Sequence, residues 1–205
     1  MKVNDMTKTI VIAGATGKTG RILTKDLIDQ GHDVIALVRE SSDTSVLPKA
    51  AKLRHADLTD LKADVCDGAD VVVFAAGSGG ETGPEMTDKV DREGAQDLVD
   101  RAKEAKAERF VMLSSIGADQ SDPSGDLAHY LKAKHDADEY LKSSGMTYAI
   151  LRPVALTDDG RSDNVVLGDA VDKSAKASRA DVAMVLADAA TSGKLDGAAV
   201  EMQSA

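Results

Sequence analysis

The stretch that decides the fold is Thr9-Ile10-Val11-Ile12-Ala13-Gly14-Ala15-Thr16-Gly17-Lys18-Thr19-Gly20, an apolar run followed at once by a glycine-rich turn. The run has the length and the β-branched content of a buried strand. After the turn, apolar residues between positions 22 and 28 recur at helical spacing until Gly31 ends the helix. The sequence therefore predicts a strand, a tight turn and a helix.

The turn carries three glycines, Gly14, Gly17 and Gly20, at three-residue spacing. Such glycines allow a sharp turn, a close approach of the backbone to a ligand and tight packing of the helix on the strand. The free N–H groups of the first helical turn face this turn, which makes an anion site suited to a pyrophosphate. The alternative is a glycine-rich turn that serves the fold and binds no ligand.

Two other glycine motifs are disfavoured by single residues. A nucleoside-triphosphate P-loop ending at Gly17-Lys18-Thr19 needs a glycine five positions before Gly17, where Ile12 stands. The usual dinucleotide fingerprint G-x-G-x-x-G needs its middle glycine at Ala15. The motif that remains is G-x-x-G-x-x-G.

Composition limits the classes of partner. The chain has 205 residues, 35 acidic against 25 basic side chains and a net charge of -10, so a long polyanion would be repelled. Its five aromatic residues are too few for a platform that stacks bases. We expect a small-molecule substrate and no nucleic acid.

The cysteine and histidine content predicts neither a disulfide nor a metal site. Cys66 is the only cysteine, which suits a reducing compartment. The four histidines have no metal-ligand spacing. No run approaches the roughly 18 apolar residues of a membrane helix, and no targeting segment is recognised. We expect a cytoplasmic protein without a metal or a membrane partner.

Strands alternate with helices along the chain. The expected strands are at about 7–13, 33–38, 53–56, 71–74, 109–113, 147–151 and 198–202, and the expected later helices are at about 84–106, 126–144 and 179–191. This alternation predicts an α/β, doubly wound parallel sheet of Rossmann-like type, with right-handed crossovers. Residues 1–205 form one domain, to which residues from about 154 to 205 contribute a small substrate cap.

In such a sheet the ligand crevice lies outside the carboxyl ends of the strands. The residues expected at that edge are Gly14, Thr16, Gly17, Lys18, Thr19, Gly20, Arg39, Asp57, Leu58, Ala75, Ala76, Gly77, Ser114, Ser115 and Pro153.

The glycine motif, together with Tyr130 and Lys134 in a Y-x-x-x-K pattern, resembles the short-chain dehydrogenase/reductase superfamily, in its small atypical branch. Tyr130 and Lys134 share one face of the predicted helix. The resemblance implies that Tyr130 exchanges a proton with the substrate, that Lys134 favours its ionised form and binds the cofactor ribose, and that Ser115, rather than Ser114, hydrogen-bonds the substrate oxygen. Asp91 stands where many members carry an asparagine of the catalytic group.

The end of the second strand indicates the cofactor. NAD-binding sites carry an acidic residue there for the ribose 2′-OH, whereas this chain has Arg39, which can pair with a 2′-phosphate. Lys18 is expected within reach of the same phosphate. We predict NADP(H) in preference to NAD(H); the alternative is that Glu40 takes the acidic role.

Asp57 and Leu58 resemble the short motif that contacts the adenine ring in this superfamily. Asp57 suits a helix N-cap equally well. In Gly77-Ser78-Gly79, Ser78 lacks the glycine at position 76 that a hydrolase nucleophile elbow requires.

The sequence thus predicts an NADPH-dependent oxidoreductase that transfers hydride to a small carbonyl, quinone or flavin-like substrate. About 50 residues follow Pro153, which leaves little room to enclose a nucleotide sugar. The alternative is a non-catalytic NAD(P)-binding sensor that resembles the regulatory members of the superfamily. In a flavin-type reductase, hydride transfer needs no tyrosine proton.

Overall fold

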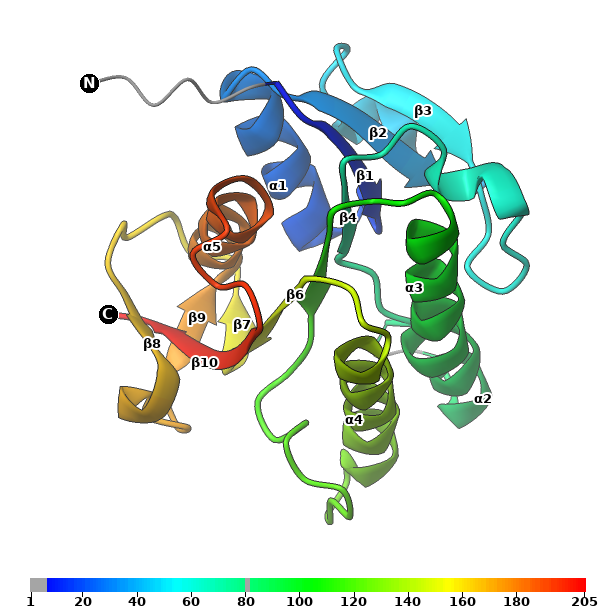
Figure 1. Cartoon of the computed structure of the whole chain (residues 1–205). Coiled ribbons are helices and arrows are strands. Elements are labelled where there is room, and N and C mark those ends of the chain that lie inside the picture. The colour runs from blue at the N-terminus through cyan, green and yellow to red at the C-terminus, as the bar shows by residue number, and fades with distance from the viewer. Residues whose placement is uncertain (1–6, 80–81) are drawn as a thin grey trace.

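A mostly parallel sheet forms the middle layer of the protein in the computed structural model, which describes residues 7–79 and 82–205 (Figure 1). In spatial order its strands are β3 (Lys52–His55), β2 (Asp33–Val38), β1 (Thr9–Ala13), β4 (Val71–Phe74), β5 (Arg109–Leu113), β6 (Tyr148–Pro153), β10 (Ala198–Ser204) and β8 (Val165–Leu167). Every pairing in this sheet is parallel except that of β10 with β8. The order confirms the predicted doubly wound sheet, and the strand order reverses between β1 and β4.

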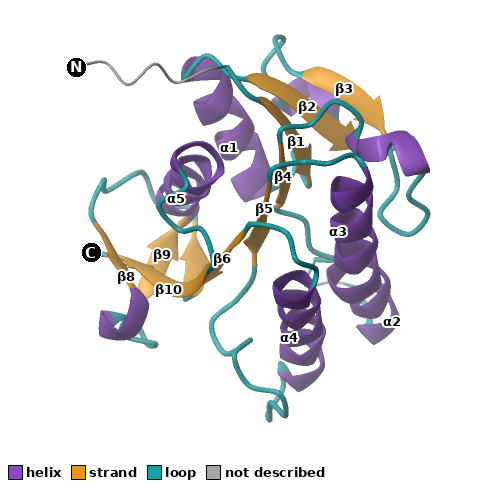
Figure 2. Ribbon diagram, in the orientation of Figure 1, coloured by secondary structure: helices purple, strands orange, loops and turns teal. Residues whose placement is uncertain are grey.

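Helices cover both faces of the sheet (Figure 2). On one face lie α1 (Lys18–Asp29) and α5 (Arg179–Ser192), which pack against each other, and on the other lie α2 (Pro84–Thr87), the π-helix η3 (Asp88–Gly94), α3 (Ala95–Glu104) and α4 (Ala128–Ser143). Short 3-10 turns occupy η1 (Thr44–Val46), η2 (Ala63–Cys66) and η4 (Gly168–Ala170). No helix within the described ranges is long and apolar enough to cross a membrane.

The core follows from the alternation of side chains along the central strands. Ile10 and Ile12 of β1 point to the cluster under α1 and α5, whereas Val11 and Ala13 join the opposite cluster under α3 and α4. All four residues of β4 are fully buried, as expected for a central parallel strand covered on both faces.

The long helix predicted at 84–106 is interrupted in the structure. The segment begins as α2, widens into the π-helix η3 and continues as α3. A π-turn adds a residue to the turn and rotates the side chains that follow, which the apolar periodicity does not reveal. Within it, Asp91 is fully buried.

The segment after residue 154 contributes to two parts of the molecule. α5 and β10 belong to the main layers, while β7 (Ala155–Thr157) and β9 (Lys176–Ser178) form a separate two-stranded sheet. That small sheet follows the carboxyl end of β6, where the sequence places a substrate cap. The role of this segment toward a substrate stays a prediction.

The glycine turn is packed so closely that side chains are excluded from it. Gly14 has a φ of +82°, and a Cβ there would lie 2.6 Å from the backbone of Ala76. A Cβ on Gly20 would lie 2.0 Å from the carbonyl oxygen of Gly14, and the Gly17 N–H donates to that same oxygen at 3.0 Å. The spacing of the three glycines therefore serves contacts of the backbone with itself, and the turn joins β1, α1 and the segment after β4.

We expect Gly20→Ala to lower the free energy of unfolding by about 1–3 kcal/mol, because the new methyl group overpacks against the Gly14 carbonyl. For a chain of this size the melting temperature should fall by roughly 2–12 °C, measured by thermal unfolding. Gly160→Ala is the matched control, since a Cβ there meets no atom within 4 Å. Equal melting temperatures for the two variants would show that the turn is not packed in this way.

Candidate functional site

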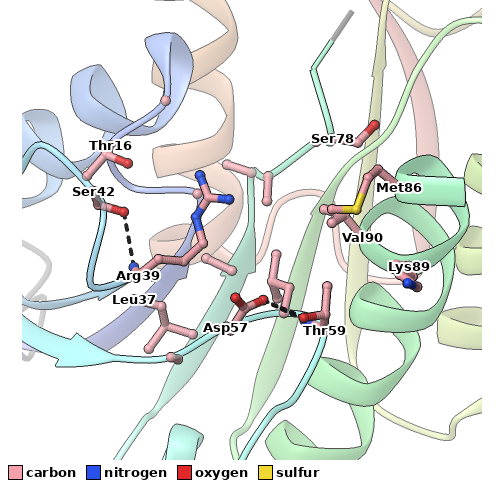
Figure 3. A pocket seen from close by; sticks show the side chains of 18 of the residues that line it. Thr16, Leu37, Arg39, Ser42, Asp57, Thr59, Ser78, Met86, Lys89 and Val90 are labelled. Atoms are coloured by element: carbon pink, nitrogen blue, oxygen red, sulfur yellow. Dashed lines mark hydrogen bonds between the residues drawn. The ribbon is translucent and has the colours of Figure 1, made fainter. Parts of the chain in front are cut away.

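A cavity of about 600 Å³ opens at the carboxyl ends of β1, β2 and β4 (Figure 3). Of the residues predicted for the site, those that line it are Gly14, Thr16, Gly17, Arg39, Asp57, Leu58, Ala75, Ala76 and Gly77. Segments far apart in the sequence therefore converge at the point where the strand order reverses, which is where ligands bind in open α/β sheets.

One end of the cavity lies beside the start of α1. Helix α1 begins at Lys18, and its N-cap Gly17 supplies no side chain to accept from the N–H groups of the first turn. Four N–H groups at a helix start lack partners within the helix, and the helix dipole adds partial positive charge there. These donors, beside a backbone that only glycine permits, suit a phosphate or pyrophosphate.

Lys18 is engaged elsewhere in the structure. Its ammonium lies 2.6 Å from a carboxylate oxygen of Asp158, and Arg179 contacts the other oxygen of that carboxylate at 2.6 Å. The hydrogen bond from Lys18 holds the pKa of Asp158 below its usual value. Lys18 does not belong to the described lining of the cavity, so its expected contact with a phosphate requires it to leave Asp158.

Arg39 forms part of the cavity wall directly after β2. Its backbone N–H donates to the Ser42 hydroxyl at 3.0 Å, and its side chain extends into the cavity (Figure 3). The guanidinium makes no hydrogen bond or ion pair with another described residue. Glu40 is directed to His55, at 3.2 Å, beside a neighbouring cavity of about 590 Å³. Of these two adjacent residues, Arg39 lines the first cavity and Glu40 does not.

Asp57 caps a turn and faces the cavity at the same time. One of its oxygens accepts from the Thr59 N–H at 2.9 Å and from the Thr59 hydroxyl at 2.8 Å, and these bonds lower the pKa of Asp57. The bonds close a turn, and no helix begins at this point, so the helix N-cap alternative is wrong. The following loop is held by Gly94, where a Cβ would lie 2.6 Å from the Leu58 carbonyl oxygen.

Two acidic side chains at the far end of the cavity were not predicted from the sequence. Glu93 and Asp97 line it one helical turn apart, next to the Asp57 loop. Their spacing at i and i+4 on a predicted helix was visible in the sequence. What it did not reveal was which face of the helix turns to the loop, because the π-turn sets that rotation.

The tyrosine and lysine of α4 lie together, outside the described lining of the cavity. The Lys134 ammonium is 5.7 Å from the centre of the Tyr130 ring and 2.9 Å from a carboxylate oxygen of Asp91. Lys134 is 2% exposed and Asp91 is fully buried. Tyr130 and Ser115 are half-buried, and the Ser115 hydroxyl has no hydrogen-bond partner among the described residues.

Ser114 belongs to a different, buried network. Its hydroxyl donates to a carboxylate oxygen of Asp138 at 2.9 Å, and Arg152 donates to the same oxygen at 2.9 Å. This network joins α4 to β5 and β6 near the carboxyl ends of these two strands. The Ser114 hydroxyl is therefore engaged within the protein, and the role predicted for Ser115 stays a prediction.

Several residues that were predicted for the site are buried in the structure. Thr19 and Gly20 are buried beneath the glycine turn, and Pro153 is buried at the end of β6. None of them is part of the described cavity lining, and the same holds for Ser114 and Lys134. Their expected contacts with a cofactor stay predictions. Among the residues that the structure describes, no group of three or more His, Cys, Asp or Glu side chains is placed to hold a metal ion.

The doubly wound sheet, the glycine turn and the cavity at its switch point define a Rossmann-fold protein of the dinucleotide-binding class. The model of a family described as NAD(P)H-binding matches residues 14–192, which is most of the chain. The protein belongs to this NAD(P)H-binding family.

Known proteins resemble the chain over most of its length. A Bacillus subtilis protein named "Uncharacterized sugar epimerase YhfK" is 34% identical over 158 residues, which cover 73% of each chain. A solved structure from Bacillus halodurans, named as a candidate NAD-dependent epimerase/dehydratase, is 31% identical, with a TM-score of 0.91 over 97% of this chain and 94% of the other. The oxidoreductase ylbE from Lactococcus lactis is 29% identical, with a TM-score of 0.84 over 96% and 91%.

The residues present fit a nicotinamide dinucleotide. Gly14 and Gly17 line the cavity beside the start of α1, and no side chain accepts from the N–H groups of the first helical turn. Arg39, a cation, and the Asp57 loop line the same cavity. The cavity therefore suits the ligand that the family binds.

Proposed function

We propose that the protein is an NADPH-dependent oxidoreductase that transfers hydride to a small carbonyl, quinone or flavin-like substrate. The observation that carries the cofactor preference is Arg39, a cation in the cavity wall at the end of β2 that forms no ion pair with another residue of the described ranges. Proteins that select NAD carry a carboxylate at this place to accept from the ribose 2′-OH. The acidic neighbour, Glu40, is directed to His55 instead.

In this proposal, each part of the cofactor contacts a different part of the cavity. The N–H groups of the α1 start hold the pyrophosphate, and the Asp57 and Leu58 loop holds the adenine ring. Arg39 pairs with the 2′-phosphate through two N–H donors, while the nearby Ser42 hydroxyl offers a further polar contact. The Lys18 ammonium contacts the same phosphate after it leaves the Asp158 carboxylate.

In this proposal, residues of α4 and of the segment after β5 transfer the proton to the substrate. When bound, the reduced nicotinamide supplies a hydride to the electrophilic carbon of the substrate. The Tyr130 hydroxyl then gives its proton to the substrate oxygen that gains the electron pair, and the Ser115 hydroxyl donates a hydrogen bond to that oxygen. The Lys134 ammonium, close to the Tyr130 ring, stabilises the phenolate that is left.

The names of relatives support a redox function without fixing the substrate. The Lactococcus lactis protein is named an oxidoreductase, whereas the Bacillus subtilis relative is named a sugar epimerase. Of the residues after Pro153, the 14 of α5 and the 7 of β10 belong to the main layers. The residues that remain are few for the enclosure of a nucleotide sugar, and a small substrate is favoured.

A non-catalytic NAD(P)-binding sensor is the second candidate. The observation that favours it is that Tyr130, Lys134 and Ser115 do not belong to the described lining of the cavity. A sensor needs the cavity alone, whereas a reductase needs substrate and nicotinamide to meet at Tyr130.

Arg39→Ala should weaken NADPH binding about 10- to 150-fold, since hydrogen bonds to a charged group contribute roughly 1.5–3 kcal/mol. NADH affinity should change little, because NADH lacks the 2′-phosphate. Fluorescence titration of the reduced nicotinamide measures both. Lys52→Ala is the matched control, as it removes a cation from β3 that pairs with Asp33 outside the cavity. An unaltered NADPH to NADH preference in Arg39→Ala would remove the assigned role.

Tyr130→Phe should lower turnover of a carbonyl or quinone probe by on the order of 10²- to 10⁴-fold, because the substrate oxygen loses its proton donor. NADPH affinity should stay that of the wild type, since Tyr130 lies outside the described cavity lining. The measurement is NADPH oxidation with phenanthrenequinone and with FMN as probes. Full activity with FMN in this variant would indicate a flavin-type reductase, and a wild type that binds NADPH without turnover would indicate the sensor.

A further inference from the structure

We infer that Asp91 is a positioning residue that anchors Lys134 in its protonated form and ties it to the cofactor-binding turn after β4. This inference rests on the proposed function for its catalytic meaning. Nothing in the family match assigns a role to Asp91, which stands where the superfamily resemblance places an asparagine.

The surroundings of Lys134 make it depend on one close counter-ion. Its ammonium lies 2.9 Å from Asp91 and 3.5 Å from the Leu113 carbonyl oxygen, and the rings of Phe74 and Tyr130 cover it at 5.4 and 5.7 Å. With 2% of the residue exposed, water does not supply a substitute. A buried cation that loses its partner is strongly disfavoured.

The charged groups around this ammonium come from three elements. Asp91 contributes from η3, Tyr130 and Asp138 from α4, and Arg152 of β6 reaches the area through its ion pair with Asp138. Burial lowers the pKa of Lys134, but the charges of Tyr130, Asp91 and Asp138 outweigh this effect and raise that pKa above its ordinary value. Asp138 already serves Arg152 and Ser114 with its paired oxygen, which leaves Asp91 as the carboxylate in contact with the lysine.

Asp91 also accepts a hydrogen bond from the backbone of the segment after β4. Its second oxygen accepts from the Ser78 N–H at 2.9 Å, and a Cβ on Gly77 would lie 3.4 Å from its first oxygen. Gly77 and Ser78 line the cofactor cavity. A single buried carboxylate therefore joins the cavity wall to the lysine behind Tyr130, and the π-turn of η3 brings it there.

Asparagine at this position can perform only one of the two tasks. Its amide oxygen can accept from the Ser78 N–H, but its NH₂ group is a donor and cannot accept from an ammonium. Asp91→Asn thus keeps the volume and the turn contact while it removes the counter-charge. Asp91→Ala removes both.

The direct test is NMR titration of the ¹³Cε resonance of Lys134, assigned by its absence in Lys134→Arg. In the wild type the midpoint should lie above the ordinary lysine value of about 10.4. In Asp91→Asn it should fall by roughly 1–3 pH units, because an opposite charge at this range shifts a pKa by that amount. Asp88→Asn is the matched control, since Asp88 lies in the same helix but pairs with Arg92 and His129.

Kinetics separate positioning from a merely structural role. With phenanthrenequinone and NADPH, the kcat of Asp91→Asn should approach that of the wild type near pH 6, where Lys134 is protonated in both. It should fall about 10-fold or more below the wild type near pH 9, as the lysine of the variant loses its proton. The NADPH Kd should rise in Asp91→Ala and stay near the wild-type value in Asp91→Asn.

A wild-type Lys134 midpoint below about 10.4 would overturn the inference without any variant. The inference would also be overturned if the Lys134 midpoint in Asp91→Asn equalled that of the wild type. The same holds if the ratio of the Asp91→Asn kcat to the wild-type kcat did not change with pH. If the wild type binds NADPH but turns over no probe, the proposed function fails, and the NMR midpoints still decide whether Asp91 governs the protonation of Lys134.

Discussion

The close contact between Gly14 and the backbone of Ala76 is the constraint on which the rest of the structure depends. It brings the turn after β1 against the segment after β4, so that the cavity lies at the point where the strand order reverses. Gly20 allows α1 to start beside the Gly14 carbonyl, and no side chain caps the N–H groups of the first helical turn. The closely packed turn and the uncapped start of α1 therefore depend on the same three glycines.

The two parts of the site differ in how they are built. The cavity at the switch point is built from strand ends, loops and helix residues, and the charged residues that line it are Arg39, Asp57, Lys89, Glu93 and Asp97. In the proposed proton-transfer group, the Lys134 ammonium is held by the buried carboxylate of Asp91. Asp91 contacts both parts, because it also accepts from the Ser78 N–H. Cofactor binding and proton transfer would then share one rigid element.

The sequence predicted the sheet and its ligand edge because these depend on local patterns. β1, β4 and β5 are apolar runs of strand length, and glycine spacing marks the turn between β1 and α1. Arg39 directly follows β2, and Asp57 lies two residues after the end of β3, so their place at the edge follows from the topology alone. These features need no knowledge of side-chain partners.

The features that the sequence did not predict depend on contacts between distant residues. Lys18 pairs with Asp158, 140 positions away, and nothing local to either residue indicates it. The π-turn of η3 decides which helix residues face inward, and helical periodicity assumes that such turns are absent. Asp91 was recognised as a departure from the superfamily pattern, but its pairing with Lys134 required the packing of η3 on α4.

The central claim is that the glycine turn and Arg39 together form a site for a dinucleotide with a 2′-phosphate. Separate titration of the wild-type protein with NADPH and NADH tests it most directly, and the absence of tryptophan keeps the background of the nicotinamide fluorescence low. The account predicts NADPH binding with NADH at least about tenfold weaker, the lower limit for a charged contact of this kind. Equal affinity for the two would contradict the role of Arg39, and binding of neither would show that the glycine turn serves the fold alone.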